Sequence, residues 1–330
     1  MHQELDVNGV GVPDGDGGLQ PFEQDVVGSA KWVGPGIEFS EILHHEYLNL
    51  ERGAARGGFS ESTGRMQFQS LMSAYERELA VARELARQAG DFALQYRKGE
   101  IQIENKSDES PVTVADKEGE KIIAGGLQRE FPEDGILGEE GAAKDTPNRR
   151  KWIIDPIDGT RDFIRNTRAW SVLLGLEENG DCVAGVAYFP ATAEMYYAAK
   201  GAGAYCNGER LRIGKAQKAS EALLCLNGIG FMHRYPFAKG LLDFCKDFWT
   251  VRSTGGCLDA MLIASGKADA WIEAQAQPWD LAPLKIIAEE AGAVTFDFAG
   301  KNTIYGGNFV ITVPALADRL RQFVGNQGVA

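Results

Sequence analysis

Asp155 and Asp158, two aspartates three positions apart, follow a short apolar stretch and precede Gly159 and Thr160. Residues three apart on a straight strand point to opposite faces, so the two carboxylates converge only if the chain turns between them. Pro156 favours such a turn, because proline fixes φ and has no N–H to lose from a sheet. Converging carboxylates form a cation site, and hard oxygen ligands favour Mg²⁺ or Ca²⁺.

Gly159 and Thr160 suggest a phosphate site next to these acids. If a helix begins just after Gly159, the N–H groups of Gly159 and Thr160 lie at its positive end and can bind phosphate. Carboxylates beside an anion site make electrostatic sense only with cations between them. The simpler alternative is a surface turn, which the D-P-x-D-G pattern also describes. The apolar stretch before it and the threonine after it favour a functional site.

The same stretch superficially resembles the Asp-x-Asp-Gly-Thr signature of haloacid-dehalogenase-type phosphatases, in which the first aspartate attacks phosphorus. That signature requires an acid two residues before Asp158, where this chain has Pro156. A covalent aspartyl-phosphate is therefore unsupported. Attack by metal-activated water is the better hypothesis.

Three further acidic residues could contribute to such a site. Glu139 and Glu140 stand between two glycines, and Asp280 follows Trp279 at the start of a helical pattern. Taken alone, paired acids between glycines indicate a solvated loop, and an aspartate at a helix start indicates a cap. The spacing by itself does not bring these acids to the Asp155 segment.

The surrounding sequence predicts alternating helices and strands. Apolar spacing of three or four predicts helices over residues 71–99, 116–131, 258–265 and 279–291. Short apolar runs predict strands over residues 151–154, 171–176, 183–189, 204–213, 293–298 and 309–312. Asn179-Gly180 suits the tight turn of a hairpin between two of these strands. The mixture predicts a layered α/β fold.

Composition narrows the class of protein. The chain has 330 residues, 44% apolar and 25% charged, which is typical of a globular protein. Its net charge of −13 argues against nucleic-acid and membrane-surface partners. The absence of a long apolar run or a leader pattern predicts a cytoplasmic protein. Four histidines, and five cysteines without a C-x-x-C pair, disfavour zinc. The glycine-rich residues 1–65 are interpreted as a poorly ordered extension, and residues 66–330 as the folded domain.

At the level of motifs, the chain resembles the inositol monophosphatase family of metal-dependent phosphatases. The resemblance rests on DPIDGT at 155–160 and WDLAPLKIIAEEAG at 279–292, with matching pieces at 108–116, 138–140 and 201–208. It implies a layered αβαβα sandwich of the inositol monophosphatase/fructose-bisphosphatase type. Residues 66–200 would form an N-terminal half with the metal site, and residues 201–330 a C-terminal half. It also implies hydrolysis of a phosphate monoester, a cofactor of two to three Mg²⁺ ions, inhibition by lithium and a homodimer.

Carried over by position, the resemblance assigns roles to individual residues. One Mg²⁺ would be bound by Glu139, Asp155 and the carbonyl of Ile157, and the second by Asp155, Asp158 and Asp280. A third, weaker ion would depend on Glu139. Thr160 and Glu139 would orient the attacking water, with Asp116 beside the threonine. The remaining roles are phosphate binding by the N–H groups of Gly159 and Thr160, support by Lys106 and Glu140, and substrate contact by Asp158, Gly255, Gly256, Cys257 and Glu273.

The choice of substrate rests on finer similarity. The segments 189–194 and 278–284 are similar to the histidinol-phosphatase branch of the family, which makes histidinol phosphate the first expected substrate. Glu273 beside an acidic metal site would suit a cationic amine or imidazole, but it could equally accept hydrogen bonds from inositol hydroxyls. Inositol 1-phosphate or another sugar or nucleotide phosphate is therefore the alternative. A non-catalytic metal-binding scaffold is the alternative from another class.

Overall fold

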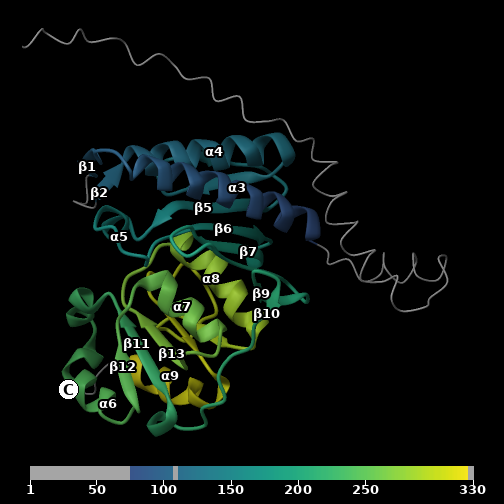
Figure 1. Cartoon of the computed structure of the whole chain (residues 1–330). Coiled ribbons are helices and arrows are strands. Elements are labelled where there is room, and N and C mark those ends of the chain that lie inside the picture. The colour runs from purple at the N-terminus through teal and green to yellow at the C-terminus, as the bar shows by residue number, and fades with distance from the viewer. Residues whose placement is uncertain (1–74, 107–110, 326–330) are drawn as a thin grey trace, which may run out of the picture. The chain divides into compact units, whose positions relative to one another are not determined.

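The structure is a computed structural model that describes residues 75–106 and 111–325. The predicted glycine-rich extension, residues 1–65, lies outside the described residues. Figure 1 shows five layers, in the order helices, sheet, helices, sheet, helices. The layered αβαβα sandwich that the sequence predicted is confirmed.

Helices α3 (Glu76–Tyr96) and α4 (Val114–Glu130) form the first layer. Helix α3 buries Leu79, Ala82, Leu85 and other residues at helical spacing, as predicted. Positions 71–74 of the predicted helix lie outside the described residues. Helix α4 begins two residues earlier than predicted, because the N-cap Thr113 accepts a hydrogen bond from Ala115 N at 3.1 Å.

An eight-stranded sheet lies under these helices, in the order β10-β9-β8-β7-β6-β5-β3-β4. Its neighbours are antiparallel except for the parallel pair β3 and β5. The predicted hairpin is confirmed, and Asn179 and Gly180 adopt the positive φ values of its turn. The strands are β3 (Gly135–Gly138), β4 (Ala143–Lys144), β5 (Arg150–Asp158), β6 (Ser171–Glu178), β7 (Asp181–Phe189), β8 (Glu194–Ala199), β9 (Gly203–Cys206) and β10 (Glu209–Arg210).

Helices α7 (Gly256–Ala264) and α8 (Pro278–Ala291) form the central layer. Helix α8 lies very close to the first sheet at two glycines. A Cβ at Gly175 would lie 2.6 Å from Ala282 Cβ, and a Cβ at Gly185 would lie 2.6 Å from Ile286 Cγ2. These glycines let the sheet approach the helix whose first turn carries Asp280.

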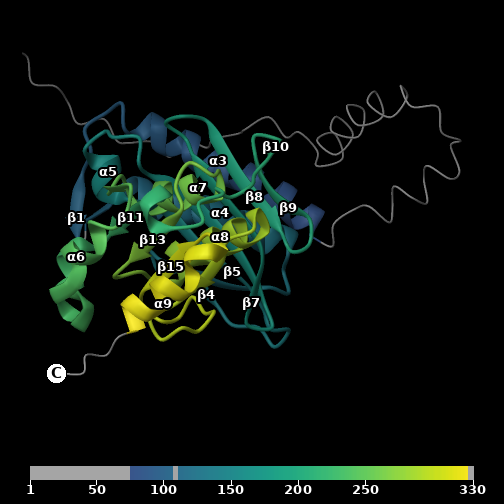
Figure 2. The same ribbon diagram turned by 90° about the horizontal axis from the view of Figure 1, so that it is seen from below.

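The second sheet has five strands in the order β12-β11-β13-β15-β14. Helix α9 (Ala317–Gly325) covers its outer face, where Leu320 and Val324 share a buried cluster with Val310 (Figure 2). The short helix α6 (Leu241–Cys245) belongs to the same end of the molecule (Figure 1). The strands are β11 (Leu223–Asn227), β12 (Thr250–Arg252), β13 (Ala270–Glu273), β14 (Val294–Phe296) and β15 (Phe309–Thr312).

The prediction of one strand over residues 204–213 is wrong. Strand β9 ends at Cys206, and Asn207 and Gly208 adopt φ values of 49° and 88°. This tight turn reverses the chain into β10, which pairs back on β9. The chain then passes from one sheet to the other between Arg210 and Leu223.

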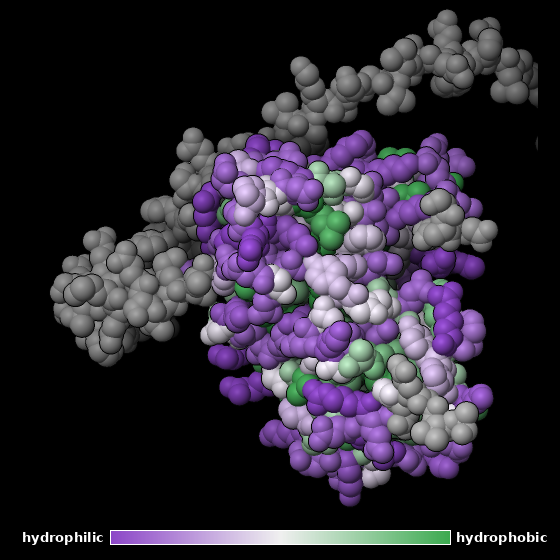
Figure 3. Space-filling model, turned by 180° about the vertical axis from the view of Figure 1, so that it is seen from behind, coloured by the Kyte–Doolittle hydropathy of each residue, from purple (hydrophilic) through white to green (hydrophobic). Residues whose placement is uncertain are grey.

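The face opposite to that of Figure 1 is mainly hydrophilic, with apolar side chains in scattered patches (Figure 3). Among the described residues, no helix has both the length and the apolar character that a bilayer span requires.

Candidate active site

The turn predicted between Asp155 and Asp158 is present at the end of β5. The pairing of β5 with β6 shifts register between these two residues, so a bulge bends the strand there. Asp155 is buried, and its Oδ1 accepts a hydrogen bond from Ile157 N at 2.9 Å. Gly159 has a φ of 84°, which suits glycine, and the short helix α5 (Thr160–Ile164) begins directly after it.

Three carboxylates meet at this bend. One oxygen from each of Asp155, Asp158 and Asp280 lies within 4.8 Å of the others. Asp280 reaches them from the first turn of α8, where its Oδ2 accepts a hydrogen bond from Gln277 N at 2.7 Å. A set of oxygen donors this close suits a hard divalent cation such as Mg²⁺.

Seven of the residues predicted from the sequence line one cavity of about 240 Å³. They come from the end of β3, the end of β5, the start of α5 and the first turn of α8. The seven are Glu139, Asp155, Ile157, Asp158, Gly159, Thr160 and Asp280. Arg161 and Asp162, which the sequence analysis did not single out, line the same cavity. Five carboxylates and one guanidinium make it strongly acidic.

Lys106 and Glu140 lie behind Glu139. The Lys106 Nζ is 2.7 Å from Glu139 Oε1 and 2.6 Å from Glu140 Oε1. Burial lowers the pKa of Lys106, but its two carboxylate partners raise it more, so the net shift is upward. Burial raises the pKa of Glu140 to about 7. Lys106 therefore stays charged and holds Glu139 at the edge of the cavity.

Glu120, which the sequence analysis missed, fixes the loop that follows Glu139. It is buried on α4, and its carboxylate accepts hydrogen bonds from Glu140 N and Ala142 N, both at 2.7 Å. Because both donors are backbone groups of the loop, Glu120 sets the direction in which the Glu139 side chain leaves the chain.

Asp116 and Thr160 form a hydrogen-bonded pair beside the cavity. Thr160 Oγ1 lies 3.2 Å from Asp116 Oδ1, and Asp116 Oδ2 accepts hydrogen bonds from Thr113 N at 2.7 Å and Thr113 Oγ1 at 2.5 Å. Burial raises the pKa of Asp116, although the Thr113 bonds lower it. With Thr113 occupying one oxygen, the other is left for Thr160. This arrangement orients the threonine hydroxyl.

The other predicted substrate residues do not line this cavity and lie at the start of α7 and the end of β13; they are Gly255, Gly256, Cys257 and Glu273. Cys257 is buried at the start of α7, and burial and the nearby Asp158 raise the pKa of its thiol. Gly255, with a φ of 141°, packs against Ala169. Glu273 is buried at the end of β13, where burial and the nearby Asp158 raise its pKa to about 8.

The Glu273 carboxylate packs against two glycines. A Cβ at Gly228 would lie 2.6 Å from Glu273 Oε1, and a Cβ at Gly256 would lie 3.5 Å from Oε2. Asp259, also missed by the sequence analysis, holds the adjoining loop: it is buried, and it accepts hydrogen bonds from Asn227 Nδ2 at 2.5 Å and from Thr254 N at 3.1 Å.

Without bound cations, the clustered acids resist ionisation. Burial, Glu139 and the neighbouring aspartates raise the pKa of Asp155, and burial and Asp158 raise that of Asp280. Burial raises the pKa of Asp158 from 3.8 to about 6. An acid with a raised pKa stabilises the fold below its unfolded pKa, and this contribution is lost as pH rises through the folded pKa.

We therefore expect millimolar Mg²⁺ to raise the Tm more at pH 8 than at pH 5, by several degrees. At pH 8 the ionised aspartates repel one another and the cation relieves that repulsion, whereas near pH 5 protons already relieve part of it. Differential scanning fluorimetry measures both gains, with Na⁺ at equal ionic strength as the control. Equal gains at the two pH values would contradict this electrostatic account.

Comparison with known proteins places the geometry in context. The chain matches the model of the inositol monophosphatase family over residues 74–324. A histidinol-phosphatase of Chlorobaculum parvum is 36% identical over 251 residues, which cover 76% of this chain and 97% of that protein. Human inositol monophosphatase 1 is 34% identical over 232 residues, which cover 66% of this chain and 82% of that protein. The structure of a Thermotoga maritima IMPase matches with a TM-score of 0.68 and 29% identity, covering 76% of this chain and 97% of that one.

Proposed function

Because the chain belongs to the inositol monophosphatase family, whose members are phosphoric monoester hydrolases, we propose that it hydrolyses histidinol phosphate with Mg²⁺ as its cofactor. The observation that carries the proposal is the convergence of Asp155, Asp158 and Asp280 within 4.8 Å, next to the Thr160 hydroxyl. Two to three ions would be held by Glu139, Asp155, the Ile157 carbonyl, Asp158 and Asp280.

Metal assistance fits the difficulty of the reaction. Phosphate-monoester hydrolysis is among the slowest uncatalysed reactions, with accelerations of up to about 10²¹-fold, while one general base supplies only about 10²–10⁴. Bound divalent ions would lower the pKa of water and neutralise charge on the phosphoryl and leaving oxygens. The donor set in the cavity, carboxylates and a carbonyl, consists of the oxygen ligands that Mg²⁺ selects.

The protein's own groups would then position the reactants. The Thr160 hydroxyl, oriented by Asp116, would accept a hydrogen bond from the attacking water, and Glu139 would hold the same water from the other side. The N–H groups of Gly159 and Thr160 stand at the start of α5, where a helix leaves its first N–H groups free, and would bind the phosphate.

Glu273 supports an amine-containing substrate. Its carboxylate is buried near Asp158, and both burial and that charge raise its pKa. Among the described residues, no lysine, arginine or histidine forms an ion pair with it. A cationic group on the substrate would restore its charge and form a charge-assisted hydrogen bond. Histidinol phosphate offers an amine and an imidazole. The name of the Chlorobaculum parvum relative supports the same choice.

We expect Glu273→Gln to lower kcat/KM for histidinol phosphate by about 10- to 100-fold, since a charge-assisted hydrogen bond contributes about 1.5–3 kcal/mol. Activity toward p-nitrophenyl phosphate, which has no cationic group, should change by less than about threefold. The two substrates are compared by steady-state phosphate release, with Glu209→Gln, at an exposed glutamate on β10, as the control variant.

A substrate panel tests the assignment directly. Histidinol phosphate, inositol 1-phosphate, fructose 1,6-bisphosphate and adenosine 3′,5′-bisphosphate are compared by kcat/KM. The proposal requires the highest value for histidinol phosphate. If inositol 1-phosphate gives the highest value, the hydroxyl-binding role of Glu273 replaces the ion-pair role.

Two further properties are proposed from family resemblance: the enzyme forms a homodimer, and lithium inhibits it by competing for a magnesium position. Light scattering would then give about twice the 35.9-kDa mass of the chain. Unchanged activity at millimolar lithium would contradict the second property.

A further inference from the structure

Asp259 is a buried acid on a helix that is otherwise apolar. Helix α7 has the sequence GCLDAMLIA, and its Asp259 is 0% exposed. Moving a carboxylate from water into a protein interior costs free energy unless strong partners replace the lost hydration. An apolar side chain would be buried here without that cost. The presence of an acid is therefore to be explained by the groups that it holds.

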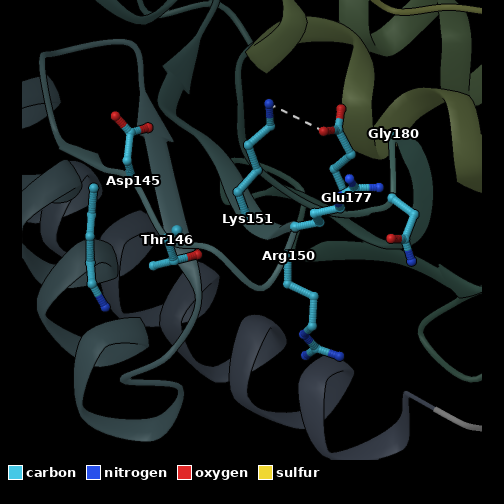
Figure 4. A pocket seen from close by; sticks show the side chains of 10 residues that line it. Asp145, Thr146, Arg150, Lys151, Glu177 and Gly180 are labelled. Atoms are coloured by element: carbon cyan, nitrogen blue, oxygen red, sulfur yellow. Dashed lines mark ion pairs between the residues drawn. The ribbon is translucent and has the colours of Figure 1, made fainter.

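Buried acids in this molecule have two kinds of partner. Glu177 pairs with a cation: Lys151 Nζ lies 3.2 Å from Glu177 Oε1, the pair drawn in Figure 4. Within the part of the chain that the structure describes, Asp259 forms no ion pair and accepts hydrogen bonds from neutral groups. Asp116 and Glu120 are also acids of this second kind, and each positions a residue of the catalytic cavity.

Asp259 joins two loops that follow strands β11 and β12. Its Oδ2 accepts hydrogen bonds from Asn227 Nδ2 at 2.5 Å, at the end of β11, and from Thr254 N at 3.1 Å, in the loop between β12 and α7. Its Oδ1 accepts a further hydrogen bond from the Thr254 hydroxyl. Both oxygens are therefore engaged, and the carboxylate ties the two loops to the first turns of α7 and to each other.

The same two loops enclose the carboxylate of Glu273. In the first loop, a Cβ at Gly228 would lie 2.6 Å from Glu273 Oε1, and in the second, a Cβ at Gly256 would lie 3.5 Å from Glu273 Oε2. Each oxygen of Glu273 therefore faces the backbone of one loop. In the sheet, Glu273 is paired with Asn227, the residue that Asp259 holds. The distance between the loops sets the width of the space for Glu273, and Asp259 is the group that bonds to both.

Ala169 connects these loops to the turn that is proposed to bind phosphate. A Cβ at Gly255, in the second loop, would lie 2.8 Å from Ala169 Cβ, and a Cβ at Gly159 would lie 2.9 Å from the Ala169 carbonyl oxygen. Ala169 therefore lies between the second loop and the start of α5. Glu273 itself is near enough to Asp158 for that charge to raise its pKa. The Glu273 carboxylate and the loops around it thus adjoin the proposed phosphate site.

We propose that Asp259 is a positioning residue for substrate selection: it fixes the two loops around Glu273 and so determines where that carboxylate meets the leaving-group part of the substrate. The inference rests on the proposed contact between Glu273 and the leaving group. Without Asp259, Asn227 and Thr254 lose their common acceptor and the loops can separate. The proposed metal and phosphate ligands are not bonded to these loops by Asp259, so the chemical step should be preserved.

The test measures steady-state phosphate release from p-nitrophenyl phosphate and from the panel substrate with the highest kcat/KM. For the panel substrate, Asp259→Ala should raise KM about tenfold and change kcat less than about threefold, because a displaced contact group weakens binding more than chemistry. Both constants for p-nitrophenyl phosphate should stay within about threefold, since its leaving group has no polar hydrogen for Glu273. Asp259→Asn should restore the KM, because its amide oxygen accepts from Asn227 and Thr254 N and its NH₂ group donates to the Thr254 hydroxyl.

Two further variants keep the test independent of folding defects. Asn227→Ala removes the bond to one loop only and should raise the same KM selectively, even if Asp259→Ala does not fold. The matched control is Asp269→Ala. Asp269 Oδ2 accepts a hydrogen bond from Leu223 N at 2.9 Å, at the opposite end of β11, so its loss should lower the Tm without changing selectivity. Equal losses toward both substrates from Asp259→Ala, the result that a purely structural role predicts, would overturn the proposal.

A double-mutant cycle with Glu273→Gln separates this inference from the function on which it rests. Selectivity is the ratio of kcat/KM for the panel substrate to that for p-nitrophenyl phosphate. If Asp259 acts through Glu273, the double variant should be no less selective than Glu273→Gln alone, whereas losses that multiply would overturn the proposal. If Glu273→Gln lowers selectivity and Asp259→Ala does not, only this inference fails. If Glu273→Gln leaves selectivity unchanged, the proposed contact of Glu273 fails and this inference fails with it.

Discussion

Asp158→Asn is expected to lower kcat/KM at least about 10³-fold and, at the same time, to raise the Tm of the metal-free protein by several degrees. Loss of a single preorganised electrostatic group already costs about 10²–10³ in kcat, and Asp158 is proposed to hold an ion that both activates water and stabilises the leaving group. The stability gain follows because the amide removes one charge from a buried cluster of acids.

The two readouts separate a functional role from a structural one. A residue needed only for folding would lower both activity and Tm, whereas a metal ligand in a crowded acidic site lowers one and raises the other. Steady-state phosphate release with Mg²⁺ and scanning fluorimetry without it measure the two. Asp243→Asn, at an exposed position on helix α6, serves as the control and should change neither. Wild-type rates from Asp158→Asn would favour the non-catalytic metal-binding scaffold.

The local chemistry of the site was predictable because it is encoded in adjacent residues. Proline and glycine between and after Asp155 and Asp158 predicted the turn and the helix start, and the structure has both. Their convergence with Asp280 was not predictable from spacing. It depends on how closely α8 packs on the first sheet at Gly175 and Gly185, which is a tertiary effect. The prediction that these segments converge came from family resemblance and not from the periodicity of the sequence.

Glu120 and Asp259 show why supporting residues escape this kind of prediction. Each lies on a helix, where an acidic residue by itself indicates an exposed position. Both are buried in the structure, because backbone N–H groups of distant or neighbouring loops satisfy their carboxylates. No feature of the sequence near Glu120 indicates that its partners lie 20 and 22 residues later.

Several strands were missed for a related reason. Strand β8, with the sequence EMYYAA, has no strict alternation, and strands β11 (LLCLN) and β13 (AWIE) contain apolar runs of only four and three residues. Runs this short fit a buried helix segment as well as a strand. They become strands because each lies between two neighbours in its sheet that satisfy its backbone hydrogen bonds. The layered α/β class was still correct, since the longer helices and strands alone required it.

Thr160→Ala and Asp116→Asn are each expected to lower kcat about 10²- to 10³-fold, and the double variant is expected to lose little more than either single one. Thr160 can orient water only if its hydroxyl hydrogen is directed to Asp116, 3.2 Å away, so the two residues act as a unit. Asparagine at position 116 can still accept the hydrogen bond from Thr113 N, but its NH₂ group cannot accept one from Thr160.

Single-turnover and steady-state rates of the four proteins in this double-mutant cycle measure the coupling. Thr160→Ser should keep most of the activity because it retains the hydroxyl. Thr167→Ala is the matched control: this threonine hydroxyl bonds to Asp162 at 2.7 Å and does not touch Asp116. If the losses of the single variants multiply in the double variant, the two residues act independently. In that case Asp116 would not act through the Thr160 hydroxyl, and its role would be its capping-box hydrogen bond with Thr113 N at the start of α4.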